Sequence, residues 1–345
     1  MKLGVVTTSY PRFEGDPAGN FVGGHVEALR TLGHHVEVFA AGDGYLDRML
    51  FARGGAPDLL ERAPIRGALA GAAFTAQLAA AVAIRAPAWD SIIAHWLVPS
   101  AIAALATRKP LLAIAHGGDI HTLRRMHLLG PVLRMLQARG ARLVFVSEQL
   151  RALAREALPS LDALVQPMGI AIDRFRAIPR APTDPPTIVT ASRLVPLKGI
   201  DVAIAAMAHI RAPARLVIAG DGPERAALAA RNTPRVAFLG QVGAARRDEL
   251  LRDASVVVVP SRVMPSGRTE GTPMIALEAL AAGVPVVASA VGGLVELDGL
   301  RLVNPDDPRA LAAAIDRTLA HPPAPELLRQ SVAHLDWQTV ARRIL

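Results

Sequence analysis

One stretch, residues 255–293, constrains the fold of this chain more than any other. It opens with a short apolar run at 255–259, rich in β-branched residues, which predicts a buried parallel strand. After a polar loop, Thr272 and Pro273 predict the N-cap and first residue of a helix. A second buried strand is expected at 284–288. A strand, a loop, a helix and a strand in this order form half of a doubly wound α/β unit, which binds ligands at the carboxyl ends of its strands.

The loop and helix start in this stretch carry its polar groups. Glu270 lies just before the predicted helix, and Glu278 lies inside it, about two turns further on. In the simpler interpretation both glutamates are solvated, as most glutamates are. A charge inside an apolar helix between two buried strands favours a binding role instead. The first N–H groups of a helix have no partner within it and suit an anion or sugar hydroxyls. Here these donors belong to Gly271, Thr272, Met274 and Ile275, while Pro273, which lies between them, has no N–H.

A pair of cations precedes the central stretch. The predicted strand 187–191 is followed by Arg193 and Lys198, which flank a turn that ends in a glycine before a helix. Two cations beside a helix N-terminus suit a diphosphate, although surface exposure is the usual position of such a pair. Gly220 and Gly222 follow the next predicted strand, 215–219, and, taken alone, predict only a tight turn.

The chain begins with another βαβ pattern. A strand at 2–8 leads into a loop at 9–24, in which Gly19 beside Asn20 lets the backbone approach a ligand closely. We expect a helix at 25–32 and then a second strand. No G-x-G-x-x-G follows the first strand, which removes the main support for a dehydrogenase.

Two histidines stand where strands of this first half end. His95 closes the predicted strand 91–95, after which a helix is expected at 99–107. His116 follows the strand 111–115 and opens the sequence HGGD, which ends at Asp119. The carboxyl ends of parallel strands form the ligand edge of such a sheet, so both histidines are candidates for binding. A single histidine is more often a satisfied structural residue, but two at equivalent strand ends favour a site.

Composition limits the class of protein. The 345 residues suffice for two domains, and a hydrophobic content of 51% can bury a core in each. We expect no signal peptide, since Met1 and Lys2 lead directly into a strand. We also expect no transmembrane span, because the most apolar tract, 68–84, is Ala-rich and contains Thr75 and Gln77, which favours a packed helix. The absence of cysteine fits the cytoplasm, and the net charge of +8 suits anionic nucleotides or an anionic membrane face.

The segment 121–142 alternates arginines with large apolar side chains. Its simpler interpretation is a pair of amphipathic helices packed on the sheet. The alternative is a basic, apolar surface for the anionic membrane interface. The residues concerned are Arg124, Arg125, Met126, Leu128, Leu129, Val132, Leu133, Arg134, Met135, Leu136, Arg139 and Arg142.

The sequence from Glu270 to Glu278, EGTPMIALE, and the sequence after it, ALAAGVPVVAS, closely resemble the E-x7-E signature of the retaining glycosyltransferases of family 4 (group 1, GT-B fold). The resemblance includes the spacing, the helix and the following strand. It extends over nearly the whole chain in the family's order. It implies an α/β fold with two Rossmann-like, doubly wound domains facing each other across a cleft. The acceptor would bind mainly to the first domain and the nucleotide sugar mainly to the second.

The resemblance and a Pro-rich sequence, PRAPTDPP, together predict the domain boundaries. The first domain would span 1–178, the linker 179–186 and the second domain 187–335. A terminal helix at 336–345 would cross back and pack on the first domain.

The resemblance also implies roles for single residues. His116 and Glu270 would be catalytic, with His116 near the reacting carbon of the donor sugar and Glu270 on its hydroxyls. Glu278 would accept from the nucleotide ribose, and His95 and Asp119 would lie on the acceptor side. The other implied contacts are the donor diphosphate for Arg193 and Lys198, the nucleotide edge for Gly220 and Gly222, the donor for Gly271, Thr272, Pro273, Met274 and Ile275, and the diphosphate and acceptor for Gly19 and Asn20.

We therefore expect a hexosyltransferase that retains configuration. The donor would be a nucleoside-diphosphate sugar, with UDP or GDP favoured, and the acceptor a sugar or a lipid-linked sugar of the cell envelope. Cations and helix N–H groups would stabilise the leaving diphosphate, so we expect no metal. We also expect no other cofactor and no nucleic-acid partner. No residue is an obvious covalent nucleophile, which favours departure and attack on the same face, with the phosphate taking the acceptor proton.

Two other functions are compatible with the same residues. A nucleotide-sugar epimerase of similar fold would form product from the donor alone, without an acceptor. A non-catalytic sugar-nucleotide binding protein would bind the donor without turnover. For all three, the expected location is the cytoplasm, with the inner face of the membrane as the alternative.

Overall fold

The computed structural model describes residues 1–11, 19–40, 64–231 and 233–345. They form two compact units. The first unit contains 1–11, 19–169 and Trp337–Leu345, and the second contains Ile170–Asp336. Part of the loop predicted at 9–24 lies outside the described residues.

The boundary between the units lies earlier than the sequence predicted. The segment 170–178 contributes Ile170, Ile172, Phe175 and Ile178 to the hydrophobic core of the second unit, where all four are buried. The first unit therefore ends at Gly169, whereas the sequence predicted its end at residue 178.

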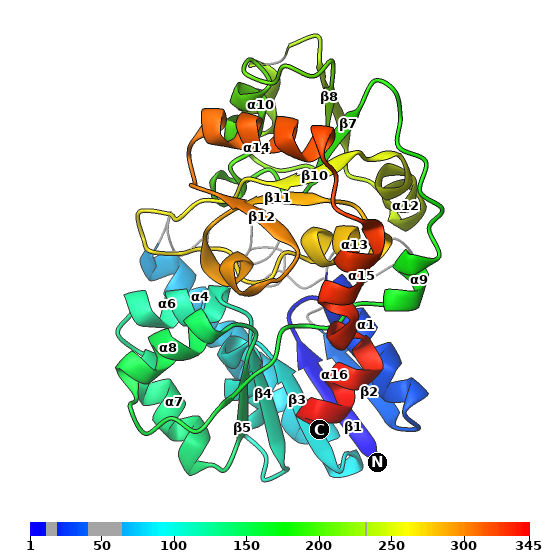
Figure 1. Ribbon diagram of the computed structural model, residues 1–345. Helices are drawn as coiled ribbons and strands as arrows, with labels where there is room; N and C mark the ends of the chain where they lie inside the picture. Colours follow the sequence, from blue (N-terminus) through cyan, green and yellow to red (C-terminus); the bar gives the residue numbers. More distant parts are fainter. Residues whose placement is uncertain (12–18, 41–63, 232) are drawn as a thin grey trace. The chain divides into compact units, whose positions relative to one another are not determined.

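A six-stranded parallel sheet forms the centre of the first unit within the described residues, in the order β2-β1-β3-β4-β5-β6 (Figure 1). Its inner strands are almost entirely buried, as expected for the continuous apolar runs of a parallel sheet covered on both faces. The strands are β1 (Lys2–Thr7), β2 (His35–Ala40), β3 (Ser91–His95), β4 (Leu111–Ala115), β5 (Arg142–Phe145) and β6 (Leu164–Val165).

The helices of the first unit depart from the prediction at two places. α1 begins at Asn20, five residues before the predicted start, and Gly24 lies within it against the indole of Trp337, where a Cβ would overlap the ring. The predicted helix at 99–107 is a wide turn at Leu97–Ala101 followed by a short helix. The helices are α1 (Asn20–Thr31), α4 (Pro64–Arg85), α5 (Ile102–Ala104), α6 (Gly118–Arg125), α7 (Leu129–Ala138), α8 (Glu148–Ala157) and the returning α16 (Trp337–Ile344).

Helix α4 bears on the expectation that the chain has no transmembrane span, which stays a prediction. Among the described residues, 66–88 is helical and is long and apolar enough to cross a bilayer by length and composition alone; in its apolar 18-residue window, 28% of the residues are buried. One face packs into the first core through Phe74, Leu78 and Val82. The other face exposes Leu69 and Ile84. The predicted packing therefore holds for one face of the helix.

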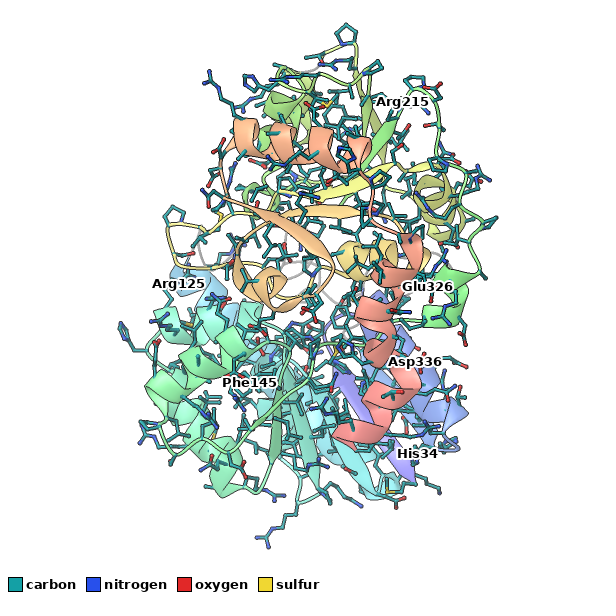
Figure 2. All side chains as sticks on the ribbon, viewed as in Figure 1. His34, Arg125, Phe145, Arg215, Glu326 and Asp336 are labelled. Carbon is teal, nitrogen blue, oxygen red and sulfur yellow. The ribbon has the colours of Figure 1, made fainter. Side chains whose placement is uncertain are left out.

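The basic, apolar segment forms α6 and α7. Leu129, Leu133 and Leu136 are buried in the first core, which confirms the simpler interpretation of a helix pair packed on the sheet. The same segment leaves three large apolar side chains more than one-third exposed, and Figure 2 shows Arg125 at the end of α6. The exposed apolar residues are Met126, Leu128 and Met135.

The second unit repeats the architecture with a parallel sheet in the order β12-β11-β10-β7-β8-β9. Since β7 is the first strand of this unit and β10 lies beside it, the chain runs outward from β7 on one side and later returns to its other side. That reversal is a topological switch point, where doubly wound sheets bind ligands. The strands are β7 (Thr187–Ala191), β8 (Arg215–Ala219), β9 (Val236–Gly240), β10 (Val256–Val259), β11 (Val286–Ser289) and β12 (Leu300–Val303).

Helices cover this second sheet, as Figure 1 shows for α14, which is drawn in orange. Eight residues of α13, from Ile275 to Ala282, are buried, which explains its nearly continuous apolar sequence. The helices are α9 (Ile172–Arg176), α10 (Ile200–Ala206), α11 (Arg225–Ala229), α12 (Ala244–Asp253), α13 (Met274–Ala282), α14 (Pro308–Ala320) and α15 (Pro325–Val332).

Candidate functional site

The start of α13 presents backbone donors. Pro273 is the N-cap, with no side-chain cap, and the helix starts at Met274, one residue later than predicted. Thr272 is therefore not the capping residue that the sequence predicted. Pro273 supplies its fixed φ at this position but has no side-chain hydrogen bond to offer the helix. No described residue accepts from the N–H groups of Gly271, Met274 and Ile275. Such a helix start suits an anion.

An ion pair lies between the loops that follow β7 and β10. The Lys198 ammonium lies 2.7 Å from Oε2 of Glu270, and the buried Ser261 hydroxyl donates to the same oxygen at 3.0 Å. The Lys198 and Glu270 side chains are 21% and 11% exposed. The two loops are also joined through the backbone, where the Arg262 N–H donates to the Leu197 carbonyl at 2.9 Å. The switch point thus brings together two predicted residues 72 positions apart in the chain.

The second glutamate of the signature is buried and paired. Glu278 lies 3.1 Å from Nη1 of Arg247 on α12, with side chains only 6% and 16% exposed. Burial raises the pKa of the Glu278 carboxyl above its ordinary value, and the charges of Arg247 and Arg174 oppose that rise. The Arg247 guanidinium also lies 5.7 Å from the ring centroid of Phe175. One carboxylate oxygen therefore faces a fixed cation, and the carboxylate keeps acceptor capacity for hydroxyls.

The glycine-rich turn after β8 supports the loop that carries Arg193. The N–H of Leu194 donates to the Asp221 carbonyl at 2.9 Å, and the N–H of Gly220 donates to the Gly240 carbonyl at 2.7 Å. Added Cβ atoms at Gly220 and Gly222 would overlap the carbonyl oxygens of Ser192 and Leu194. Both glycines thus hold the loop in place, while Arg193 itself is exposed.

Replacing Gly220 with alanine is expected to lower the free energy of unfolding by about 1–3 kcal/mol, because φ is +136° there and the new methyl group would meet the Ser192 carbonyl. The matched control is Gly243→Ala, where φ is −78° and a Cβ would meet nothing within 4 Å. The control should cost less than about 1 kcal/mol. Urea denaturation of the three proteins measures both differences, and equal losses would contradict the proposed support.

In the first unit, three histidines form a continuous chain of hydrogen bonds. His25 Nδ1 lies 3.1 Å from His95 Nε2, and His95 Nδ1 lies 3.0 Å from His116 Nε2. Burial lowers the pKa of His25 to about 4 and that of His116 to about 3, and it holds the pKa of His95 well below its ordinary value. All three rings are therefore neutral at neutral pH. Phe21 and Trp96 lie against His116, each with ring centroids 4.8 Å from it.

Asp119 fixes the loop that carries His116. Its buried carboxylate accepts from the backbone N–H groups of Leu97, Gly117 and Ile120 at 2.7, 3.0 and 3.0 Å, and from that of His116 at 3.3 Å. Burial raises the pKa of Asp119, and these backbone donors oppose the rise. The structure thus gives Asp119 a positioning role, and a direct contact of Asp119 or His95 with an acceptor stays a prediction.

Gly19 and Asn20 lie at the start of α1. Gly19 is the left-handed N-cap residue, and its carbonyl accepts from the N–H groups of Val22 and Gly23 at 2.8 and 3.0 Å. Asn20 is the first residue of the helix and is partly exposed. Both lie where a helix start can face a ligand, and their contact with a diphosphate or acceptor stays a prediction.

Sequence reasoning missed the partners of the predicted residues. In the second unit Arg247 and Ser261 pair with the two glutamates, and in the first unit His25 completes the histidine chain. None of the three belongs to a recognisable motif. One signal was available: Phe21 and His25 are four residues apart, so they share one face of a helix that starts at Asn20. Among the described residues, no group of three or more His, Cys, Asp or Glu is arranged to hold a metal.

The comparisons with known proteins match both units. Residues 18–169 match the family model "Glycosyl transferase 4-like domain", and residues 185–321 match "Glycosyl transferases group 1". The D-inositol 3-phosphate glycosyltransferase of Acidothermus cellulolyticus is 30% identical over 322 residues, which cover 79% of this chain and 70% of that protein. The putative teichuronic acid biosynthesis glycosyltransferase TuaC of Bacillus subtilis is 30% identical over 247 residues, 66% of this chain and 61% of that protein.

A solved structure agrees with the fold. Anabaena Alr3699/HepE in complex with UDP-glucose superimposes with a TM-score of 0.70 at 20% identity, covering 100% of this chain and 98% of that one. At that identity the likeness shows the fold alone, and it confirms the predicted α/β architecture with two parallel sheets. A family model matches each unit, a relative is 30% identical over most of both chains, and the E-x7-E glutamates lie at a switch point. This chain therefore belongs to the group 1 glycosyltransferases.

Proposed function

We propose that this glycosyltransferase moves a sugar from a nucleoside-diphosphate sugar to an acceptor hydroxyl, with retention of configuration and with the donor bound to the second unit. The observation that carries the proposal is the Lys198–Glu270 pair at the switch point. Glu270 directly precedes the N–H groups of Gly271, Met274 and Ile275, from which no described residue accepts. A cation, a carboxylate and helix donors are the groups that a sugar diphosphate needs.

The diphosphate would bind Lys198, Arg193 and the first N–H groups of α13. An ammonium has three donors, so Lys198 can hold Glu270 and still donate to a phosphate oxygen. As the bond between sugar and phosphate breaks, negative charge grows on the diphosphate. Donors already aimed at that place stabilise the charge without reorganisation. Arg193, which the turn at Gly220 supports, adds a second cation.

The two glutamates would bind different parts of the donor. Glu270 would accept from hydroxyls of the transferred sugar, with its carboxylate already oriented by Lys198 and Ser261. Glu278 would accept from the ribose hydroxyls, with Arg247 fixing one oxygen of the buried carboxylate and opposing the rise of its pKa. UDP and GDP are the favoured donor nucleotides, and HepE, which shares the fold, was solved with UDP-glucose.

His116, which belongs to the first unit, would contact the donor sugar near the reacting carbon. The sequence offers no obvious covalent nucleophile, so we propose that leaving group and acceptor share one face of the sugar. The diphosphate oxygen then takes the acceptor proton as the new bond forms. The neutral ring of His116 would contact the sugar through a hydrogen bond and not through charge.

The acceptor is proposed to be a sugar or a lipid-linked sugar of the cell envelope. TuaC is named for teichuronic acid biosynthesis, which supports a polysaccharide acceptor. The first unit also exposes Met126, Leu128 and Met135 on a segment rich in arginine. Such a surface suits peripheral contact with an anionic membrane from the cytoplasmic side.

Replacing Glu270 with alanine should lower kcat more than it weakens donor binding, because Glu270 acts on the transferred sugar and the nucleotide keeps its other contacts. We expect a loss of about 10²–10³ in kcat. The assay incubates each protein with a nucleotide sugar and an acceptor and follows transfer by NMR, which also reports the anomeric configuration. Equal turnover by wild type and Glu270→Ala would contradict the proposal. Product formed from the donor alone would favour a nucleotide-sugar epimerase. Donor binding without turnover would favour a non-catalytic sugar-nucleotide binding protein.

A further inference from the structure

The three-histidine chain ends inside the protein at a nitrogen without a partner. His25 and His95 are fully buried, and Nε2 of His25 has no hydrogen-bond partner among the described residues. The ring of His25 is stacked on Trp337 of α16, with centroids 5.5 Å apart and planes 7° from parallel. The other end of the chain is His116, whose Nδ1 has no partner among the described residues and whose side chain is partly exposed. The chain therefore has one closed end and one open end.

The hydrogen bonds allow only two neutral arrangements. A neutral imidazole carries one N–H and one lone pair. If His25 Nδ1 donates to His95 Nε2, then His95 Nδ1 must donate to Nε2 of His116, and all three rings are protonated at Nδ1. In the reverse direction all three are protonated at Nε2. Because the bonds always join Nδ1 of one ring to Nε2 of the next, mixed tautomers would leave two lone pairs or two N–H groups facing each other.

The closed end prevents exchange between these arrangements. Changing all three rings from one tautomer to the other moves a proton out at one end of the chain and requires a proton to enter at the other. At the inner end this would be Nε2 of His25, which is buried and has no described partner to supply or accept a proton. Nδ1 of His116, at the partly exposed end of the chain of rings, is consequently always a donor or always an acceptor.

We propose that His25, through His95, is a positioning residue that locks His116 in a single tautomer and ring orientation for contact with the donor sugar. The inference rests on the proposed function of His116. It assigns a role to His25, which lies in α1 and belongs to no motif of the signature. The groups that face this chain are the three histidines themselves, the aromatic rings of Phe21, Trp96 and Trp337, and the carboxylate of Asp119, which bonds the His116 backbone.

The decisive variant is His25→Phe, which keeps a ring to stack on Trp337 but removes both nitrogens. His95 then loses one of the two hydrogen bonds that fix its ring, and His116 loses its lock. With ¹⁵N-labelled histidine, long-range ¹H–¹⁵N NMR reports the tautomer of each ring without any substrate. We expect one common tautomer for His25, His95 and His116 in the wild type, and a mixture for His116 in His25→Phe.

Kinetics add a second readout. We expect kcat to fall about tenfold in His25→Phe with the donor KM changed less, since residues that orient a ligand-contacting histidine are worth about 10- to 100-fold in metal sites. His25→Asn places a polar atom close to the position of Nδ1, so it should restore both the His116 tautomer and most of kcat. The matched control is His35→Phe, on the exposed first residue of β2, which should change neither readout.

Two outcomes would overturn the inference. One is a wild type in which the three rings have different tautomers. The other is a His116 signal that is identical in wild type and His25→Phe. If His25→Phe fails to fold, the wild-type spectrum and His25→Asn still decide. A wild type without any transfer activity would defeat the proposed function, but the NMR result would stand or fall independently.

Discussion

Replacing Lys198 with alanine is expected to lower kcat/KM for the donor by about 10²–10³-fold, the usual loss when one stabilising group is removed from a developing anion. Lys198 is mostly buried and is fixed 2.7 Å from Glu270 at the switch point. Its removal would take a cation from the proposed diphosphate site and would also free the Glu270 carboxylate, so two groups of that site would lose their geometry at once. Initial rates over a range of donor concentrations measure the effect.

A matched control separates this local effect from net charge. Arg211 is exposed and precedes β8, at the amino edge of the same sheet, away from the carboxyl edge that carries the site. Arg211→Ala removes one positive charge as Lys198→Ala does, and it should leave kcat/KM within about twofold, as distant surface charges are largely screened. Similar losses in the two variants would mean that Lys198 acts only through the overall charge.

Replacing Glu278 with alanine is expected to give the largest loss of stability, about 3–5 kcal/mol, because it leaves the Arg247 guanidinium buried and without its counter-ion. Loss of one partner of a buried pair exposes the full desolvation cost of the other. The double variant Glu278→Ala/Arg247→Met should recover part of the loss, since no unpaired charge remains. Urea denaturation without ligand measures all three variants.

The control for this prediction lies on α12, the helix that carries Arg247. Arg246 and Glu249 form an ion pair on α12 with side chains 52% and 45% exposed. Glu249→Ala should cost at most about 1 kcal/mol, the usual range for an exposed pair. If Glu278→Ala costs no more than Glu249→Ala, Glu278 is not held as a buried charge, and its proposed role toward the ribose loses its basis.

Much of the fold follows from local sequence. The apolar runs that form β3, β4, β7 and β8 are bounded by turn residues and lie at the predicted positions. A parallel strand buried on both faces leaves a continuous apolar run, which is a strong local signal. The helix α13 was equally readable, except that Pro273 and not Thr272 is the N-cap.

The helix starts and contacts over long sequence distances were less readable. α1 begins at Asn20 because left-handed Gly19 can end the loop there, whereas the two glycines inside the helix suggested that the loop continued. Gly24 is needed for the approach of Trp337, which comes from the opposite end of the chain. No pattern within a short window of sequence can report such a partner.

The same limit applies to the site. The motif supplied Glu270 and Glu278, but the cation that pairs with Glu278 is Arg247, on another helix. Likewise, His95 and His116 stand at predicted strand ends, whereas the ring that completes their chain is His25, 70 positions before His95. Charged and aromatic side chains occur at many positions, and only the packing of elements selects these partners.

The most direct test of the central claim is thermal unfolding of wild type and Lys198→Ala with UDP, GDP, ADP, TDP and their sugars, without added metal. A ligand that binds only the folded protein stabilises it by about 2.7 kcal/mol at 100 times its Kd. We predict that one nucleotide and its sugar raise the midpoint of the wild type clearly and that of Lys198→Ala much less. No shift with any nucleotide, or equal shifts in both proteins, would contradict a donor site built around Lys198 and Glu270.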